Sequence, residues 1–172
     1  MSNQIKYIIG DYERVSNDQS LISEGCTFLS IQLPEDGQTI IGRNRLHNPL
    51  CRCVAIIQLE LTAMYSSAYQ NNKYKVDILI PQSYPFSPPK VIFKTPIDHI
   101  NICDLSGLVT HSFLGSEWCM IGFRVIIMEM LQLFTVPRPQ DMIFNQPINS
   151  SSINQLVPMQ NKVLNDLDFF DF

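Results

Sequence analysis

Residues 74–110, YKVDILIPQSYPFSPPKVIFKTPIDHINICDLSGLVT, decide the fold of this chain. Alternating apolar residues predict a strand over Tyr74–Ile80, and a second apolar run predicts another over Val91–Lys94. The segment between them, Pro81–Pro89, belongs to neither a helix nor a ladder interior, because proline lacks an amide donor and fixes φ. We expect Tyr84 and Phe86 to anchor this crossing segment to the core.

The rest of the chain predicts an α+β domain in which helices pack on one face of about four antiparallel strands. The pattern indicates strands at Cys26–Leu33 and Cys51–Met64 and helices at Gln4–Val15 and Phe123–Phe134. In the last of these, apolar residues recur at the three- and four-residue spacing of a buried helix face. In the first, Tyr7, Ile8 and Tyr12 are expected to share a face.

The polar segment Gln38–Asn48 separates the first two strands. It is interpreted either as an insertion or as a long hairpin whose arms are Thr39–Gly42 and the strand that begins at Cys51. Arg43 and Arg45 are expected to lie at a solvated loop tip, and binding of an acidic partner is the alternative.

The C-terminal part differs in composition from the rest and divides the chain into a domain at 1–147 and an extension at 148–172. The extension is rich in Asn, Gln and Ser and holds one helical candidate, Pro158–Leu167. It ends in Phe169, Phe170 and Phe172. These three side chains either pack back on the domain or insert into a partner's groove, because exposed apolar clusters mark contact sites.

Composition limits the class of protein. The chain has 172 residues, of which 45% are hydrophobic and 16% charged, which is typical of one folded domain. The net charge of −4 gives no basic footprint for nucleic acid. We expect no membrane span, metal site or cofactor, because no long apolar run, zinc spacing or phosphate-binding loop occurs. The five cysteines form no framework, which predicts a reducing compartment, cytoplasmic or nuclear; an organellar assembly stays open.

Residues 74–110 resemble the ubiquitin-conjugating enzyme family. The family's aromatic-Pro-aromatic-x-Pro-Pro hallmark stands here as residues 84–89, YPFSPP. The family's His-Pro-Asn loop corresponds to His99, Ile100 and Asn101, and its glycine to Gly107. The resemblance covers roughly residues 7–147 and implies a UBC-like fold with an N-terminal helix, an antiparallel meander and C-terminal helices.

One departure from the family pattern decides the functional prediction. The catalytic cysteine position falls on Thr110. Thioester transfer needs a thiolate, and a threonine hydroxyl is a poor nucleophile without a strong base beside it. We therefore expect no enzyme activity, with His99 and Asn101 retained as structural loop residues. Two alternatives are a Thr110–His111 pair and a displaced nucleophile at Cys103 or Cys119; we expect the neighbouring acids to leave Cys103 without an electropositive setting.

By resemblance, the chain is a non-catalytic ubiquitin-conjugating enzyme variant. Such a protein binds ubiquitin, an active conjugating enzyme, or both, and positions an acceptor ubiquitin. Tyr7 and Tyr12 on the N-terminal helix and the three terminal phenylalanines are the predicted partner-binding residues, although Tyr7 and Tyr12 packing on the sheet is the simpler alternative. Two other functions stay open: a structural accessory subunit of a large assembly without ubiquitin contact, and a peptide-binding protein that sorts ubiquitinated cargo.

Overall fold

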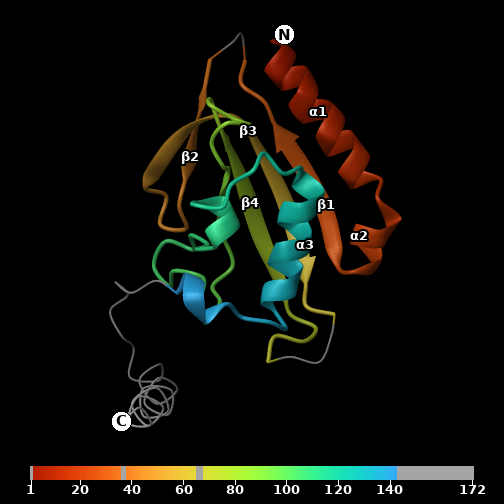
Figure 1. The fold of residues 1–172 in the computed structure, drawn as a ribbon, viewed down its shortest axis with the longest axis vertical. Helices are drawn as coiled ribbons and strands as arrows, with labels where there is room; N and C mark the ends of the chain where they lie inside the picture. The colour runs from red at the N-terminus through yellow and green to blue at the C-terminus, as the bar shows by residue number, and fades with distance from the viewer. Residues whose placement is uncertain (1, 36–37, 65–67, 143–172) are drawn as a thin grey trace, which may run out of the picture.

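The computed structural model describes residues 2–35, 38–64 and 68–142. Two helices, α1 (Asn3–Ser16) and α2 (Gln19–Ser23), precede the sheet, and α3 (Phe123–Leu133) follows it (Figure 1). Single 3₁₀ turns lie at Ser112–Leu114 and Pro139–Asp141. The predicted domain boundary at residue 147 and the predicted helix at 158–167 lie outside the described residues.

One antiparallel sheet organises the domain. Its strands are β1 (Cys26–Gln32), β2 (Ile40–Arg43), β3 (Pro49–Thr62), β4 (Lys73–Pro81) and β5 (Lys90–Phe93). The order is β1-β3-β4-β5, and β2 pairs with the first part of β3 while β1 pairs with the second part. The α+β prediction is confirmed, and the segment after the first strand forms the hairpin rather than an unstructured insertion.

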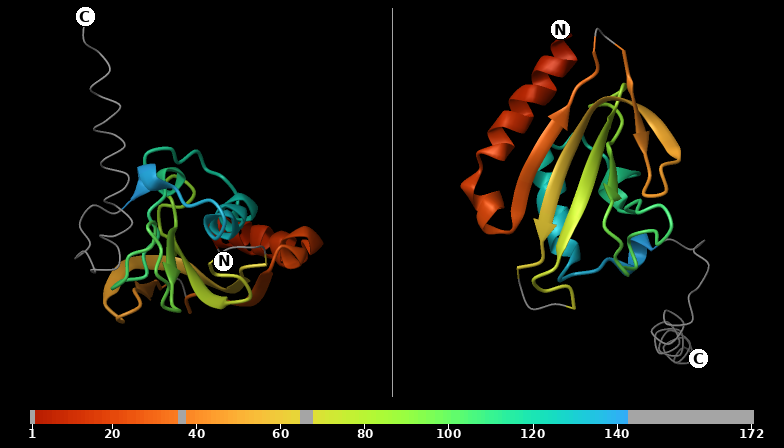
Figure 2. Two further views of the ribbon diagram at one scale, coloured as in Figure 1. Left: turned by 90° about the horizontal axis from the view of Figure 1, so that it is seen from below. Right: turned by 180° about the vertical axis from the view of Figure 1, so that it is seen from behind.

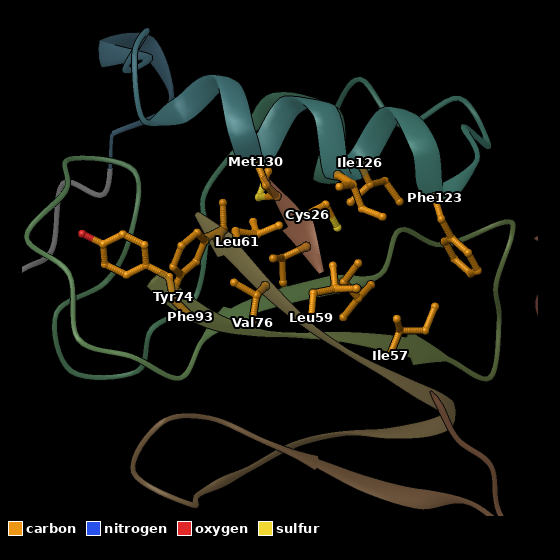
Figure 3. Packing of buried hydrophobic residues seen from close by; sticks show 14 of the residues in the cluster. Cys26, Ile57, Leu59, Leu61, Tyr74, Val76, Phe93, Phe123, Ile126 and Met130 are labelled. Carbon is orange, nitrogen blue, oxygen red and sulfur yellow. The ribbon is translucent and has the colours of Figure 1, made fainter. Parts of the chain in front are cut away.

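The helices cover one face of the sheet and enclose the main core (Figure 2, left). Ile57, Leu59 and Leu61 alternate along β3 and point toward α3, which supplies Phe123 and Met130 (Figure 3). Side chains of this size each stabilise the fold by roughly 1.5–3 kcal/mol when fully buried. The alternation of apolar side chains along β3 therefore determines which face of the sheet the helices cover.

A smaller cluster lies on the opposite face of the sheet. Cys53, Ile56, Leu79 and Ile92 are buried there, and they are covered by partly buried side chains of the β2–β3 hairpin and of Leu108. The hairpin curls away from α3, below the sheet in Figure 3. Its inner side is thus part of the packed domain, although its sequence is largely polar.

The N-terminal helix differs in detail from the prediction. Ile8, Asp11 and Val15 are its buried residues, spaced by three and four positions. Tyr7 lies at the margin with 49% of its surface exposed, so the expected shared face of Tyr7 with Ile8 is wrong. Tyr12 packs edge-on against Phe28 of β1, with ring centroids 5.8 Å apart.

Candidate functional site

The candidate site is the loop from Asp98 to Thr110, which returns alongside β5. Single bridges pair Ile92 with Leu108 and Ile102 with Val109. Gly107 adopts φ 73° and its amide donates to the Cys103 carbonyl. A Cβ at this glycine would lie 2.2 Å from the Phe93 carbonyl oxygen, so the close approach of loop and strand requires glycine here.

Thr110 ends this loop with both of its donors bonded to one carbonyl. Its amide donates to the Asn101 oxygen at 2.8 Å, and its Oγ1 donates to the same oxygen at 3.2 Å. The acceptor of the hydroxyl proton is thus a peptide carbonyl, which is too weak a base to remove it. Within the described part of the chain, no hydrogen bond joins Thr110 to His111.

His111 points instead to a charged cluster that the sequence did not predict. Its Nε2 lies 3.3 Å from Glu129 and its Nδ1 lies 3.7 Å from Asp141, while Arg138 pairs with Asp141 at 3.1 Å. Burial, with the Arg138 charge, lowers the pKa of His111, and the two carboxylates oppose that shift. Because these residues come from three separate segments, no local motif marks the cluster.

His99 and Asn101 tie the loop to the end of α3. The Nδ1 of His99 accepts from the Asn101 amide at 3.1 Å, so its Nε2 carries the proton and donates to the Leu133 carbonyl at 2.9 Å. The Asn101 side chain makes two hydrogen bonds to the backbone of Arg138, at 2.7 and 2.9 Å. The bonds of both side chains are therefore made with backbone, and the residues position the loop.

Burial lowers the pKa of His99 below its ordinary value of 6.5, because the charged imidazole is disfavoured away from water. The unfolded chain gains a proton as the pH falls through 6.5, whereas the folded chain gains it only at lower pH. The free energy of unfolding is therefore expected to decrease as the pH is lowered below about 6.5. The pKa of His111 is also lowered, so His111 adds to this loss of stability at low pH.

We expect His99→Gln to reduce this pH dependence. Urea unfolding at pH 7.5 and pH 5 measures the difference for the parent chain and the variant. His47→Gln is the matched control, because His47 is the exposed histidine of the three. If the free energy of unfolding changed by the same amount between the two pH values in all three proteins, His99 would not be a source of the pH dependence.

The cysteines differ sharply in their surroundings. Burial raises the pKa of Cys26 and of Cys53 to about 12. Burial also acts to raise the pKa of Cys103, but hydrogen bonds from the Ser106 hydroxyl and the amides of Ser106 and Leu105 outweigh it, so the pKa is lowered. The setting of Cys103 thus favours the thiolate more than its acidic neighbours suggested from sequence.

A groove of about 310 Å³ lies between the start of α1 and the proline-rich crossing segment. Gln4 of α1 donates to the Gln82 carbonyl at 2.8 Å, and Trp118 Nε1 donates to the Pro85 carbonyl at 2.7 Å. Tyr84 is buried as predicted, but Phe86 is 81% exposed on the groove wall, so its prediction as a core anchor is wrong. The irregular backbone between the strands lets one aromatic ring point inward and the other outward.

Of the predicted partner-binding residues, the structure places Tyr7 on this groove and Tyr12 on the sheet. Phe169, Phe170 and Phe172 lie outside the described residues. Within residues 2–35, 38–64 and 68–142 there is no group of three or more His, Cys, Asp or Glu side chains suited to a metal ion. The same residues contain no helix long and apolar enough to cross a membrane.

Comparison with known proteins identifies the class to which this fold and loop belong. The family model "Ubiquitin-conjugating enzyme" matches residues 32–162, and the chain belongs to that family. It is similar to a probable ubiquitin-conjugating enzyme E2 of Acanthamoeba polyphaga mimivirus, with 24% identity over 94% of this chain and 90% of that protein. Human ubiquitin-conjugating enzyme E2 K is 31% identical over 48% of this chain, a match that spans only 42% of that relative's length.

Solved structures show the same fold. H. polymorpha ubiquitin conjugating enzyme Pex4p, solved in complex with the soluble domain of Pex22p, superposes with a TM-score of 0.64 at 18% identity. The superposition covers 96% of this chain and 94% of that one. The E2 domain of a Toxoplasma gondii ubiquitin conjugating enzyme gives a TM-score of 0.51 at 18% identity, with 86% and 91% covered. At these identities the likeness concerns the fold alone.

Proposed function

We propose that this chain is a catalytically inactive ubiquitin-conjugating enzyme variant that binds ubiquitin, an active conjugating enzyme, or both. The proposal is supported by Thr110, the residue to which the family motif assigns the nucleophile position, whose hydroxyl donates to the Asn101 carbonyl at 3.2 Å. A thiolate both attacks and leaves readily near neutral pH, and an unactivated hydroxyl does neither. The remaining function of such a domain is to bind and orient other proteins.

The groove beside α1 supports the binding part of the proposal. Tyr7 and Phe86, 49% and 81% exposed, present aromatic surface on either side of it. Aromatic side chains are enriched at protein interfaces because they bury much apolar area at little entropic cost. Docked there, an active conjugating enzyme brings its donor ubiquitin to an acceptor held by this chain, which is catalysis by positioning.

Binding tests the proposal directly. The purified chain is titrated with ubiquitin and with a panel of active conjugating enzymes by isothermal titration calorimetry, up to a few hundred micromolar. We expect saturable binding to at least one of them, and faster synthesis of ubiquitin chains when that enzyme is assayed with the variant. Failure to bind either class at these concentrations would refute the proposal.

A structural role in a larger assembly is the second candidate function. The hairpin that packs on the outer face of the sheet favours it, and Pex4p, a solved relative in fold, is itself seen with a partner protein. Mass spectrometry of what co-purifies with the tagged chain separates the two. A stoichiometric conjugating enzyme or ubiquitin supports the variant function, and a fixed set of unrelated proteins supports the structural one.

A further inference from the structure

The β2–β3 hairpin is unusual in its charge. Residues 38–59 contain three arginines and one histidine but no aspartate or glutamate, in a chain whose net charge is −4. The arginines are Arg43, Arg45 and Arg52. A local excess of one charge in a protein of the opposite net charge produces a field that attracts a complementary partner.

These arginines lack carboxylate partners in the structure. The chain's other three arginines each form an ion pair: Arg14 with Asp11, Arg124 with Asp18, and Arg138 with Asp141. Among the described residues, no carboxylate lies within ion-pair distance of Arg43, Arg45 or Arg52. Among the described residues, the arginines without a carboxylate partner are therefore all on this hairpin.

The strand register places two of the arginines on one face. Ile41 pairs with Arg52, and Arg43 follows Ile41 by two residues, so the three side chains share the side that faces solvent. All three are exposed, whereas Gly42 and Cys53 on the other side are buried. The hairpin is thus amphipathic, with an outer face of two guanidinium groups around one exposed isoleucine. We call this the basic hairpin face.

Arg45 holds that face in place rather than lying at a solvated tip as predicted. Its amide donates to the Ser106 carbonyl at 2.8 Å and its Nη2 to the Cys103 carbonyl at 3.1 Å. Lys94 adds a hydrogen bond to the Asn44 carbonyl at 3.0 Å. The hairpin tip is therefore fixed to the loop that carries the vacated nucleophile position, and Figure 1 shows the two segments side by side. A rigid face loses little entropy when it binds.

We propose that the basic hairpin face is a docking surface for an acidic, extended segment of a partner protein, one with a carboxylate at every second residue so that the carboxylates share one side. Guanidinium groups suit carboxylates because their donors match the two oxygens. Ile41 packs against the methylene groups of the acidic side chains. Strand β2 pairs only with β3 within the described part of the sheet, so its outer edge has backbone groups to which an extended peptide can add. This inference does not depend on the proposed function.

A protein segment fits the face better than nucleic acid does. The outer face presents Ile41 and no aromatic ring on which a base could stack, and the chain as a whole is acidic. The free edge of β2 offers main-chain hydrogen bonds that a peptide backbone can return. Nucleic acid remains a distinguishable outcome of the experiment.

Fluorescence anisotropy with defined probes tests the proposal on the full chain. The probes are a fluorescein-labelled peptide, Glu-Val-Glu-Thr-Glu-Val-Glu-Thr-Glu, the same peptide with Gln for every Glu, and a labelled single-stranded DNA 12-mer. The variant Arg43→Gln/Arg52→Gln is compared with Lys6→Gln/Lys75→Gln, which removes the same charge from two exposed lysines elsewhere. Arg52→Gln alone is the second variant, since Arg43 also donates to the His47 carbonyl within the hairpin.

Relative to the parent chain, we expect the affinity for the acidic peptide to fall at least fivefold in the double arginine variant and at least twofold in Arg52→Gln. The affinity of the lysine control is expected to stay within twofold of the parent's. Binding is expected to weaken as salt rises, because exposed charges are screened, and the Gln peptide is expected not to bind. Three results would each overturn the proposal: no binding at 1 mM protein, equal losses in the arginine and lysine variants, or tighter binding of the DNA than of the acidic peptide.

Discussion

Asp11→Ala is expected to lower the free energy of unfolding by about 2–3 kcal/mol, the cost of losing a charged, buried hydrogen bond. Asp11 is 3% exposed on α1, and its Oδ2 accepts from the Phe123 amide at 3.0 Å, the first amide of α3. Gly122 precedes α3 and has no side chain to cap it. Asp11 therefore serves as the cap, and its charge also favours the positive end of the helix dipole.

Urea unfolding measures this effect against two matched variants. Asp11→Asn keeps an oxygen acceptor in the same place and is expected to lose less stability than Asp11→Ala. Glu13→Ala removes an exposed acid two positions along the same helix and is expected to change stability by less than about 0.5 kcal/mol. Equal losses from Asp11→Ala and Glu13→Ala would show that the cap contributes nothing.

Phe86→Ala is expected to weaken binding of the partner identified by calorimetry at least tenfold, about 1.4 kcal/mol, while leaving stability almost unchanged. The side chain is 81% exposed, so the folded monomer gains little from it. A central aromatic side chain at an interface commonly contributes this much or more. The partner's affinity and the urea midpoint are both measured for each protein.

Val136→Ala is the control for Phe86→Ala, because Val136 is also exposed, at 64%, but does not line the groove. We expect this variant to bind like the parent chain. If Phe86→Ala bound the partner with parental affinity, the groove would not be the docking site and the partner would have to contact another face.

The sequence predicted the elements whose signal is local. The apolar run in β3, the alternation along β4 and the three- and four-residue spacing in α3 are local signals of burial. Those elements lie within two residues of their predicted ends. Asn71 adopts φ 64°, in the left-handed region that asparagine tolerates better than most residues. These features depend only on residues close together in the chain.

The features that the sequence did not predict depend on contacts between distant segments or on irregular backbone that has no sequence period. Asp11 and Phe123 are 112 residues apart, so nothing near either one marks the cap. The inward and outward directions of Tyr84 and Phe86 are set by an irregular crossing with no period. The lowered pKa of Cys103 depends on backbone amides that come close to its thiol only when residues 103–107 form their turn. At the candidate site, the motif therefore located the loop but not the bonds that Thr110 and its neighbours make.

We propose above all that the chain binds its partners without carrying ubiquitin covalently. The most direct measurement is a charging reaction with ubiquitin-activating enzyme, ATP and fluorescent ubiquitin, resolved without reductant beside an active conjugating enzyme. We predict no adduct on this chain. A thiol-sensitive adduct that Cys103→Ser abolishes, or a thiol-resistant ester that Thr110→Val abolishes, would contradict the account and make the protein an active enzyme with an unusual nucleophile.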